Sequence, residues 1–134
     1  MSMGMRALKV LWASPNTMLG LSIGVVLFPF GARMRANDGI IEIDGPPVAY
    51  FLRRVPIWGG ALALTLGHVI LARSREDQVP CRRHELVHVR QYEIWGPLFL
   101  PAYLIASLRA RLSGGRAYRD NVFEDEAYTR EREA

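Results

Sequence analysis

The chain has few of the residues on which several classes of protein depend. Its 134 residues include one cysteine, Cys81, one lysine, Lys9, and three histidines. A single cysteine excludes an internal disulfide and leaves the redox compartment open. Neither a low-complexity tract nor an internal repeat occurs, and half of the residues are hydrophobic. We therefore expect a folded chain and not a disordered one.

A concentrated basic surface is missing as well. The net charge is +4, but the sixteen arginines are spread from Arg6 to Arg132. Nucleic-acid binding needs a basic stripe with side chains that stack on bases or read their edges, so we expect no nucleic-acid partner. The length allows one domain with a modest core and leaves no room for a second catalytic lobe.

An apolar run of about 20 residues, the length of an ordinary membrane span, is also missing. Three shorter runs carry no formal charge, and prolines interrupt or border them: 18–32, 55–72 and 94–108. They fit buried core, re-entrant segments or helices on a membrane surface, and the basic start at Arg6 and Lys9 also suits a signal sequence. We expect association with the cell membrane, with a soluble protein as the alternative.

The first 60 residues carry no motif that indicates a function. Residues 1–13 form a basic, partly apolar lead-in, after which Ser14 or Asn16 can cap a helix from Met18 to Phe28. Two glycines four residues apart give this helix a small face for close packing. The alternative is that they loosen a strand or a loop.

Two segments have the pattern of strands. Residues 37–47 place turn residues on both sides of "IIEI", which predicts a short strand or hairpin arm. Residues 61–71, "ALALTLGHVIL", alternate along two faces. A strand fits the second half better, because Thr65 and Val69 are β-branched and Gly67 would weaken a helix by about 1 kcal/mol.

The segment "CRRHELVHVRQYEIWGP" carries the strongest motif. Nothing breaks a helix between Pro80, placed in its first turn with Asp77 as a cap, and the Gly96-Pro97 pair that ends it. On this helix His84 and His88 share a face about 5 to 6 Å apart, so both imidazoles can point at one ion. Glu85 lies roughly 100° around from His84, where it can take a proton from a metal-bound water.

A catalytic zinc usually has three protein ligands and one open position, so two histidines leave one ligand to find. The alternative is that His84 and Glu85 are surface residues and that His88 is a hydrogen-bonded core histidine. Apolar residues between the histidines favour a buried helix, and Gln91 continues their face. The lack of a downstream histidine argues against a metzincin-type site.

An acidic segment, "NVFEDEAY" (residues 121–128), offers the third ligand and begins a further helix. Glu124 faces the same side as Ala127, which is small enough to let another helix approach. Glu126 is the competing ligand. Alternatively, Asn121 and Glu124 form a capping box, in which Glu124 bonds the backbone and no metal.

Together, "HELVH" with its following Gln and the later "FEDEA" resemble the gluzincin metallopeptidases. The likeness extends to small bacterial proteins that combine such a motif with "WGPL" and a preceding "TLGHVI", and it covers roughly residues 61–128. It implies His84, His88 and Glu124 as zinc ligands and Glu85 as general base. Tyr128 stands where membrane-bound relatives of the prenyl-protease type have an aspartate that steadies a ligand histidine. Its hydroxyl could replace that aspartate or donate to an oxyanion, and packing is its favoured role.

Several other residues have a structural and a functional interpretation. His68 and Cys81 can reach a metal site, yet a lone histidine on an apolar face and a free thiol are more often structural. Trp95, Phe99 and Tyr103 run at helical spacing, which is typical of core or membrane-interface aromatics before a substrate pocket.

The sequence therefore predicts a single domain, residues 1–134, with an apolar N-terminal region (1–60) and a metal-site region (61–134). We expect an α+β fold: a mostly helical, minimal zincin-like domain with a short antiparallel strand element. The expected function is zinc-dependent hydrolysis of a peptide or protein, with Glu85 activating the water. The alternatives are a zinc-stabilised, membrane-associated binding or structural protein without catalysis, and a membrane protein whose motif is accidental.

Overall fold

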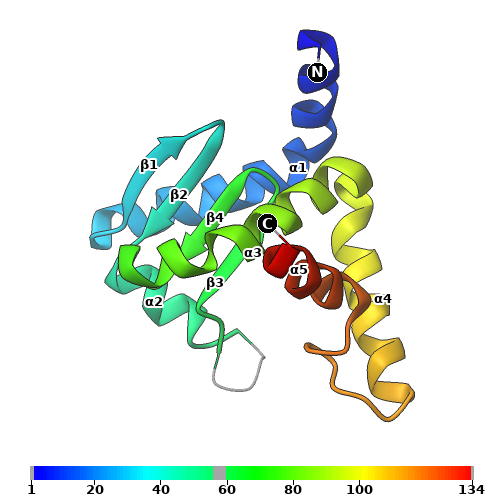
Figure 1. The fold of residues 1–134 in the computed structure, drawn as a ribbon. Coiled ribbons are helices and arrows are strands. Elements are labelled where there is room, and N and C mark those ends of the chain that lie inside the picture. Colours follow the sequence, from blue (N-terminus) through cyan, green and yellow to red (C-terminus); the bar gives the residue numbers. More distant parts are fainter. Residues whose placement is uncertain (1, 56–59, 134) are drawn as a thin grey trace.

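The structure is a computed structural model that describes residues 2–55 and 60–133. A four-stranded mixed sheet lies among five helices (Figure 1), so the expected mostly helical α+β class is confirmed. The elements in chain order are α1 (Met3–Leu27), β1 (Arg33–Asn37), β2 (Ile40–Asp44), α2 (Pro46–Leu52), β3 (Ala63–Leu66), β4 (Val69–Ala72), α3 (Arg75–Trp95), α4 (Phe99–Leu112) and α5 (Val122–Glu133). Short 3₁₀ helices follow α1 (Phe28–Phe30) and α3 (Gly96–Leu98).

The sheet has the order β1-β2-β4-β3 and consists of two antiparallel hairpins. The segment "IIEI" is one hairpin arm, as expected, and the turn before it has positive φ at Asp38 (52°) and Gly39 (79°), as a tight hairpin turn requires. The expected antiparallel element was incomplete, because β2 and β4 pair in parallel and join the hairpins. Residues from the first 60 thus share one sheet with the region that carries the motif.

A strand in the second half of segment 61–71 is confirmed by β4, but the segment as a whole is a hairpin and not one continuous alternating strand. Gly67 turns the chain at φ +62° between β3 and β4, and the backbone N–H of His68 donates to Thr17 Oγ1 at 3.0 Å. β4 is wholly buried. The described part of the apolar run 55–72 is therefore mostly sheet core, whereas residues 56–59, with Pro56, lie outside the described residues.

α1 is much longer than expected. It begins at Met3 with Ser2 as its N-cap and passes through Pro15, so neither the lead-in over residues 1–13 nor a cap at Ser14 or Asn16 is correct. Pro15 has no N–H to donate to the Leu11 carbonyl, but the Ser14 hydroxyl donates to that oxygen at 2.6 Å. Prolines bend helices, and the N-terminal turns of α1 project away from the sheet (Figure 1).

The inner face of α1 packs on the sheet through its small residues. Gly20 and Gly24 are buried, and a Cβ at Gly20 would lie 2.8 Å from Cβ of Val69. Their expected close packing is confirmed, and the strand or loop alternative is wrong. α1 and the following Phe28–Phe30 turn are also long and apolar enough to cross a membrane or to act as a signal sequence, by length and composition alone.

α3 covers the other face of the sheet. Its Val89 packs with Ile40 and Ile70, whereas Ile43 and Val69 face α1 and α2. The helix ends before Gly96, as expected, but it begins at Arg75 and not near Pro80. Its N-cap is Ser74, whose hydroxyl accepts from the N–H of Asp77 at 3.1 Å, and Pro80 lies in its second turn.

The first prediction concerns the contact between α1 and the sheet. Gly20→Val should lower the free energy of unfolding by about 1 to 3 kcal/mol, because the new side chain overlaps Val69. Gly4→Val is the matched control, since nothing lies within 4 Å of a Cβ at Gly4. The measurement is the unfolding transition of both variants in the same buffer. Equal stability of the two variants would show that α1 does not pack on β4 in this way.

Candidate metal centre

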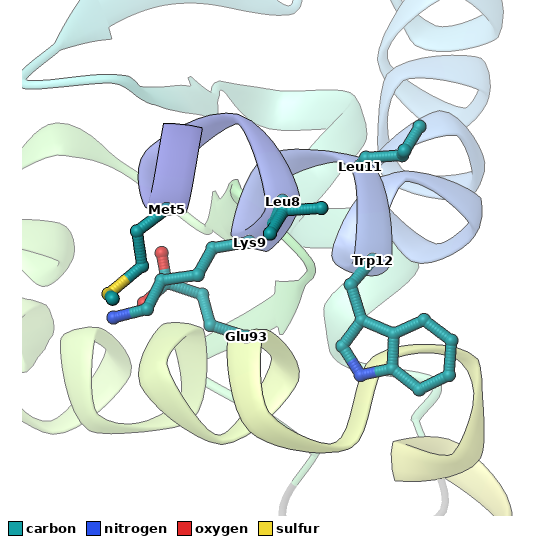
Figure 2. A pocket seen from close by; sticks show the side chains of 6 residues that line it. All are labelled: Met5, Leu8, Lys9, Leu11, Trp12 and Glu93. Carbon is teal, nitrogen blue, oxygen red and sulfur yellow. The ribbon is translucent and has the colours of Figure 1, made fainter. Parts of the chain in front are cut away.

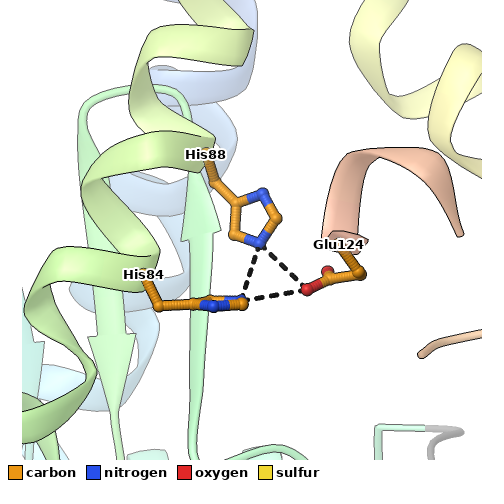
Figure 3. A group of neighbouring side chains, drawn as sticks. All are labelled: His84, His88 and Glu124. Carbon is orange, nitrogen blue, oxygen red and sulfur yellow. Dashed lines mark hydrogen bonds and ion pairs between the residues drawn. The ribbon is translucent and has the colours of Figure 1, made fainter. Parts of the chain in front are cut away.

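The motif helix α3 and the C-terminal helix α5 lie against each other and bring three potential ligands together (Figure 3). His84 Nε2 lies 3.0 Å from Oε1 of Glu124, His88 Nε2 lies 3.2 Å from the same oxygen, and the two Nε2 atoms are 3.2 Å apart. The exposed fractions are only 6% for each histidine and 3% for Glu124. These residues lie close enough to hold a metal ion.

The spacing of the three atoms fits a common tetrahedral ion. Zinc binds histidine nitrogen and carboxylate oxygen at about 2.0 to 2.2 Å, which holds neighbouring tetrahedral ligands about 3.3 Å apart. The separations of 3.0 to 3.2 Å are close to that value. Two imidazole nitrogens and a carboxylate oxygen are also a common donor set for zinc and related divalent ions.

The pKa values of His88 and Glu124 are both shifted against the effect of burial, in the directions that favour the charged forms. Burial lowers the pKa of His88, but hydrogen bonding to Glu124 and the charges of Glu85 and Glu124 outweigh it and raise the pKa to about 9. Burial raises the pKa of Glu124, but hydrogen bonds from both histidines outweigh it and bring this pKa well below its usual range. Without a metal the centre therefore holds a proton among the three ligands at neutral pH, and a metal must displace that proton.

Gln91, which lies seven residues after His84 and continues the face of the histidines, fixes the orientation of His88. Its side-chain oxygen lies 2.8 Å from Nδ1 of His88, so the free ring nitrogen is Nε2, which faces the other ligands. The amide of Gln91 donates to the Phe123 carbonyl at 3.0 Å and to Glu126 at 2.8 Å. Gln91 thus ties α3 to α5.

The two candidate glutamates have different surroundings. Glu124 faces the histidines, whereas Glu126 contacts Gln91 and lies 3.7 Å from Arg130. The capping-box alternative is wrong for Glu124. Asn121 does accept from a backbone N–H, that of Phe123 at 2.8 Å, but the Glu124 carboxylate contacts side chains and not the backbone. Ala127 is fully buried at the contact of α5 with its neighbours, as its size predicted.

Tyr103 is the residue of the centre that the sequence did not reveal. Its hydroxyl donates to Oε2 of Glu124 at 2.6 Å, so one carboxylate oxygen is occupied and only Oε1 faces the histidines. We expected a core or interface aromatic from its spacing with Trp95 and Phe99, and its ring does pack between Phe99 and Phe123. No local pattern marks the hydroxyl, because its partner lies 21 residues away.

His84 is oriented from the other side of the centre. The Tyr128 ring lies 4.4 Å from the His84 ring and 4.2 Å from the Arg119 guanidinium, which agrees with the packing role favoured for Tyr128. Nδ1 of His84 is buried without a hydrogen-bond partner among the described residues, and Oε2 of Glu131 lies 3.7 Å from it. Glu131, one helical turn after Tyr128, is thus the carboxylate on this side of the ring.

Glu85, the expected general base, is buried between α3 and the sheet. Its Oε2 accepts from the Thr65 hydroxyl at 2.5 Å, and the Tyr92 hydroxyl donates to the Thr65 carbonyl at 2.9 Å. The charge of Glu85 contributes to the raised pKa of His88. Strand β3 therefore holds Glu85 in place beside the ligands.

His68 and Cys81 do not join the His84-His88-Glu124 group. His68 lies in the β3–β4 turn and its Nε2 is 2.9 Å from Oε2 of Glu93. Cys81 is half-buried, and burial raises the pKa of its thiol. The contact of His68 and the partial burial of Cys81 agree with the structural interpretation of these residues.

Comparison with known protein families, with curated proteins and with solved structures finds no match for this chain. The function must therefore be argued from the residues of the centre.

The second prediction concerns Tyr103. Tyr103→Phe should weaken metal binding by about 10- to 100-fold, because outer partners that orient a ligand typically have effects of this size. Tyr128→Phe is the matched control, since among the described residues the one hydrogen-bond partner of its hydroxyl is Tyr118, at 3.5 Å. Competition with a chromophoric chelator measures both affinities. If the two variants bind zinc equally, Tyr103 does not hold the carboxylate of Glu124.

Proposed function

We propose that the protein is a zinc-dependent metallopeptidase in which His84, His88 and Glu124 hold the metal. The observation that carries the proposal is the approach of two Nε2 atoms and one carboxylate oxygen to within 3.0 to 3.2 Å of one another in a buried site. With these three ligands one tetrahedral position is left for water or substrate, as in catalytic zinc sites. When bound there, zinc would lower the pKa of a water to about 7 and polarise a carbonyl.

Glu85 is the proposed general base. It follows the first ligand on α3, and Thr65 holds one oxygen of its carboxylate. Its carboxylate would accept a proton from the attacking water and return it to the leaving amine as the peptide bond breaks. Tyr103 and Gln91 would keep Glu124 and His88 in the orientation that leaves the fourth position open.

We also propose that the protein works at the cell membrane. The length and apolar composition of α1 support this, as does the exposure of large apolar side chains on α1 and α4. A monomeric soluble protein rarely exposes large contiguous apolar patches. A peptide or protein substrate would then be met at or near the membrane surface.

The second candidate function is a zinc-stabilised binding or structural protein, and the burial of the centre favours it. All three ligands are at least nine-tenths buried. Two surface hollows lie away from the centre: one beneath the start of α1, lined in part by Met5 and Glu93, and one along α5, lined in part by Asp125 and Thr129. A peptidase needs a path for substrate, whereas structural zinc sites are closed.

The third prediction tests the ligand set. Glu124→Gln should lower the zinc content of purified protein strongly, because an amide is a much weaker zinc ligand than a carboxylate. Glu126→Gln is the matched control and should bind close to one zinc per chain, and His84→Ala or His88→Ala should lose the metal. Metal analysis by mass spectrometry measures all four variants. If the histidine variants contain as much zinc as the wild type, these residues do not form a zinc site.

The fourth prediction separates the peptidase from the scaffold. Glu85→Gln should keep the zinc but lower hydrolysis by about 10² to 10⁴, since an amide cannot accept the proton of the water. Glu76→Gln, in the first turn of the same helix, is the control and should keep full activity. The assay is cleavage of a fluorogenic peptide library, with zinc content and melting temperature recorded for each protein.

Activity that survives in Glu85→Gln would show that another base or a contaminant is responsible. A wild type that binds zinc but cleaves no peptide, with a melting temperature that falls when zinc is removed, would favour the scaffold.

A further inference from the structure

Acidic residues are strictly segregated along the chain. All thirteen lie in residues 38–93 and 120–133. The two remaining segments, 1–37 and 94–119, contain α1 and α4 and have no Asp or Glu. Both segments are basic, through Arg6, Lys9, Arg33, Arg35, Arg109, Arg111, Arg116 and Arg119. Positive charge without any negative charge therefore coincides with α1 and α4, two helices rich in apolar residues.

The outer faces of these helices are apolar and uncovered. α1 presents an exposed stripe at helical spacing, with side chains 46 to 68% exposed: Leu11, Met18, Leu19, Val25 and Val26. α4 presents a second stripe, 58 to 77% exposed: Leu104, Ile105, Leu108 and Leu112. Such stripes normally face a protein core. Here they face outward, and the arginines near them include Arg109 and Arg111 in the last turn of α4.

The two stripes belong to neighbouring parts of the molecule. The Trp12 indole donates to the Ile94 carbonyl at 3.0 Å, and the Asn16 amide donates to the Gly96 carbonyl at 3.0 Å. These bonds fix the middle of α1 to the turn from which α4 starts. Figure 2 shows Trp12 beside that turn, and shows Met5 and Lys9 reaching toward Glu93 on α3. Glu93, the one acidic group here, also pairs with His68.

α1 cannot both cross a bilayer and keep its contacts with the domain. Its inner face holds Gly20 against Val69 and Gly24 against Ile43, and Asn16 is buried with its amide bonded to Gly96. A spanning α1 would have to leave the sheet and uncover these core residues. Only the outer face of the helix is therefore available to lipid.

We infer that the outer faces of α1 and α4 bind the surface of an anionic lipid bilayer, with α1 lying in the interface and not crossing the membrane. This deepens the proposed membrane association by naming the surface and the lipid charge. The apolar stripes would enter the headgroup region, as in interfacial helices. Three basic residues without a carboxylate partner among the described ion pairs would meet the lipid phosphates: Arg6, Arg109 and Arg111. A second copy of the chain would bring the same positive charge to the contact, so lipid is the better occupant.

The fifth prediction concerns binding of the zinc-loaded protein to vesicles. The protein should sediment with anionic vesicles of phosphatidylcholine and phosphatidylglycerol, and its affinity for them should fall as the salt concentration rises. Its affinity for neutral vesicles of phosphatidylcholine alone should be much weaker. Leu104→Glu with Leu108→Glu, and separately Met18→Glu with Val25→Glu, should each weaken binding by about tenfold or more, because apolar burial is replaced by charge. Val79→Glu with Val122→Glu is the matched control: both residues are 63% exposed, but they lie on α3 and α5, which carry the acidic residues that α1 and α4 lack.

The position of α1 is tested by labelling. In a Cys81→Ser background, Ser2→Cys should react with a membrane-impermeant maleimide when the protein is added outside vesicles. Protection until the vesicles are lysed would show that α1 crosses the bilayer and would overturn the inference.

Other outcomes separate this inference from the proposals before it. If the stripe variants bind vesicles as well as the wild type does, the proposed membrane association stands, but the outer faces of α1 and α4 are not the binding surface. Failure to bind anionic vesicles, with a dimer in solution that the stripe variants dissociate, would assign the surface to a second copy. Zinc content, measured in the same samples, reports on the metal centre whichever result is found.

Discussion

The need to satisfy buried polar groups on α3 governs the architecture. Five polar side chains of this helix are buried, and four of them belong to the motif segment: His84, Glu85, His88 and Gln91. Buried polar groups cost free energy unless they are hydrogen-bonded, and a helix cannot supply side-chain partners for all of its own residues. The partners come from both sides, because β3 supplies Thr65 to Glu85 and α5 supplies Glu124 to the histidines. The sheet and the C-terminal helix are thereby fixed to α3.

The same requirement explains why a cation suits the centre. Glu124 offers one oxygen to two imidazole nitrogens, and those nitrogens also lie 3.2 Å from each other. Three acceptor atoms can remain so close only when a proton or a metal lies among them, which agrees with the raised pKa of His88. The structure thus supports metal binding by local electrostatics, whereas catalysis depends in addition on access to Glu85.

Sequence reasoning succeeded where the information was local. The four-residue spacing of His84 and His88 and the stop at Gly96 were read from one helix, and the structure brings both histidines together. Glu124 was favoured through a resemblance and a small neighbour at Ala127, and it does face the histidines. Long-range contacts had no local sign: the Tyr103 hydroxyl meets a carboxylate 21 residues away. The extent of α1 was missed because proline normally breaks a helix, so Pro15 argued against a helix through this position. Helix propensities do not reveal that the Ser14 hydroxyl donates to the Leu11 carbonyl in place of the missing backbone N–H.

The connection between α1 and the end of α3 relates the proposed lipid surface to the metal centre. Trp12 and Asn16 donate to the carbonyls of Ile94, in the last turn of α3, and of Gly96, which follows it, less than three helical turns after His88. A rigid helix transmits its position along its length, so fixing the end of α3 at a bilayer would also fix the height of the histidines above the lipid. The centre would then meet only chain segments at that height, such as those that emerge from the bilayer. Under the proposed function, membrane attachment through this surface would restrict the substrates to such segments.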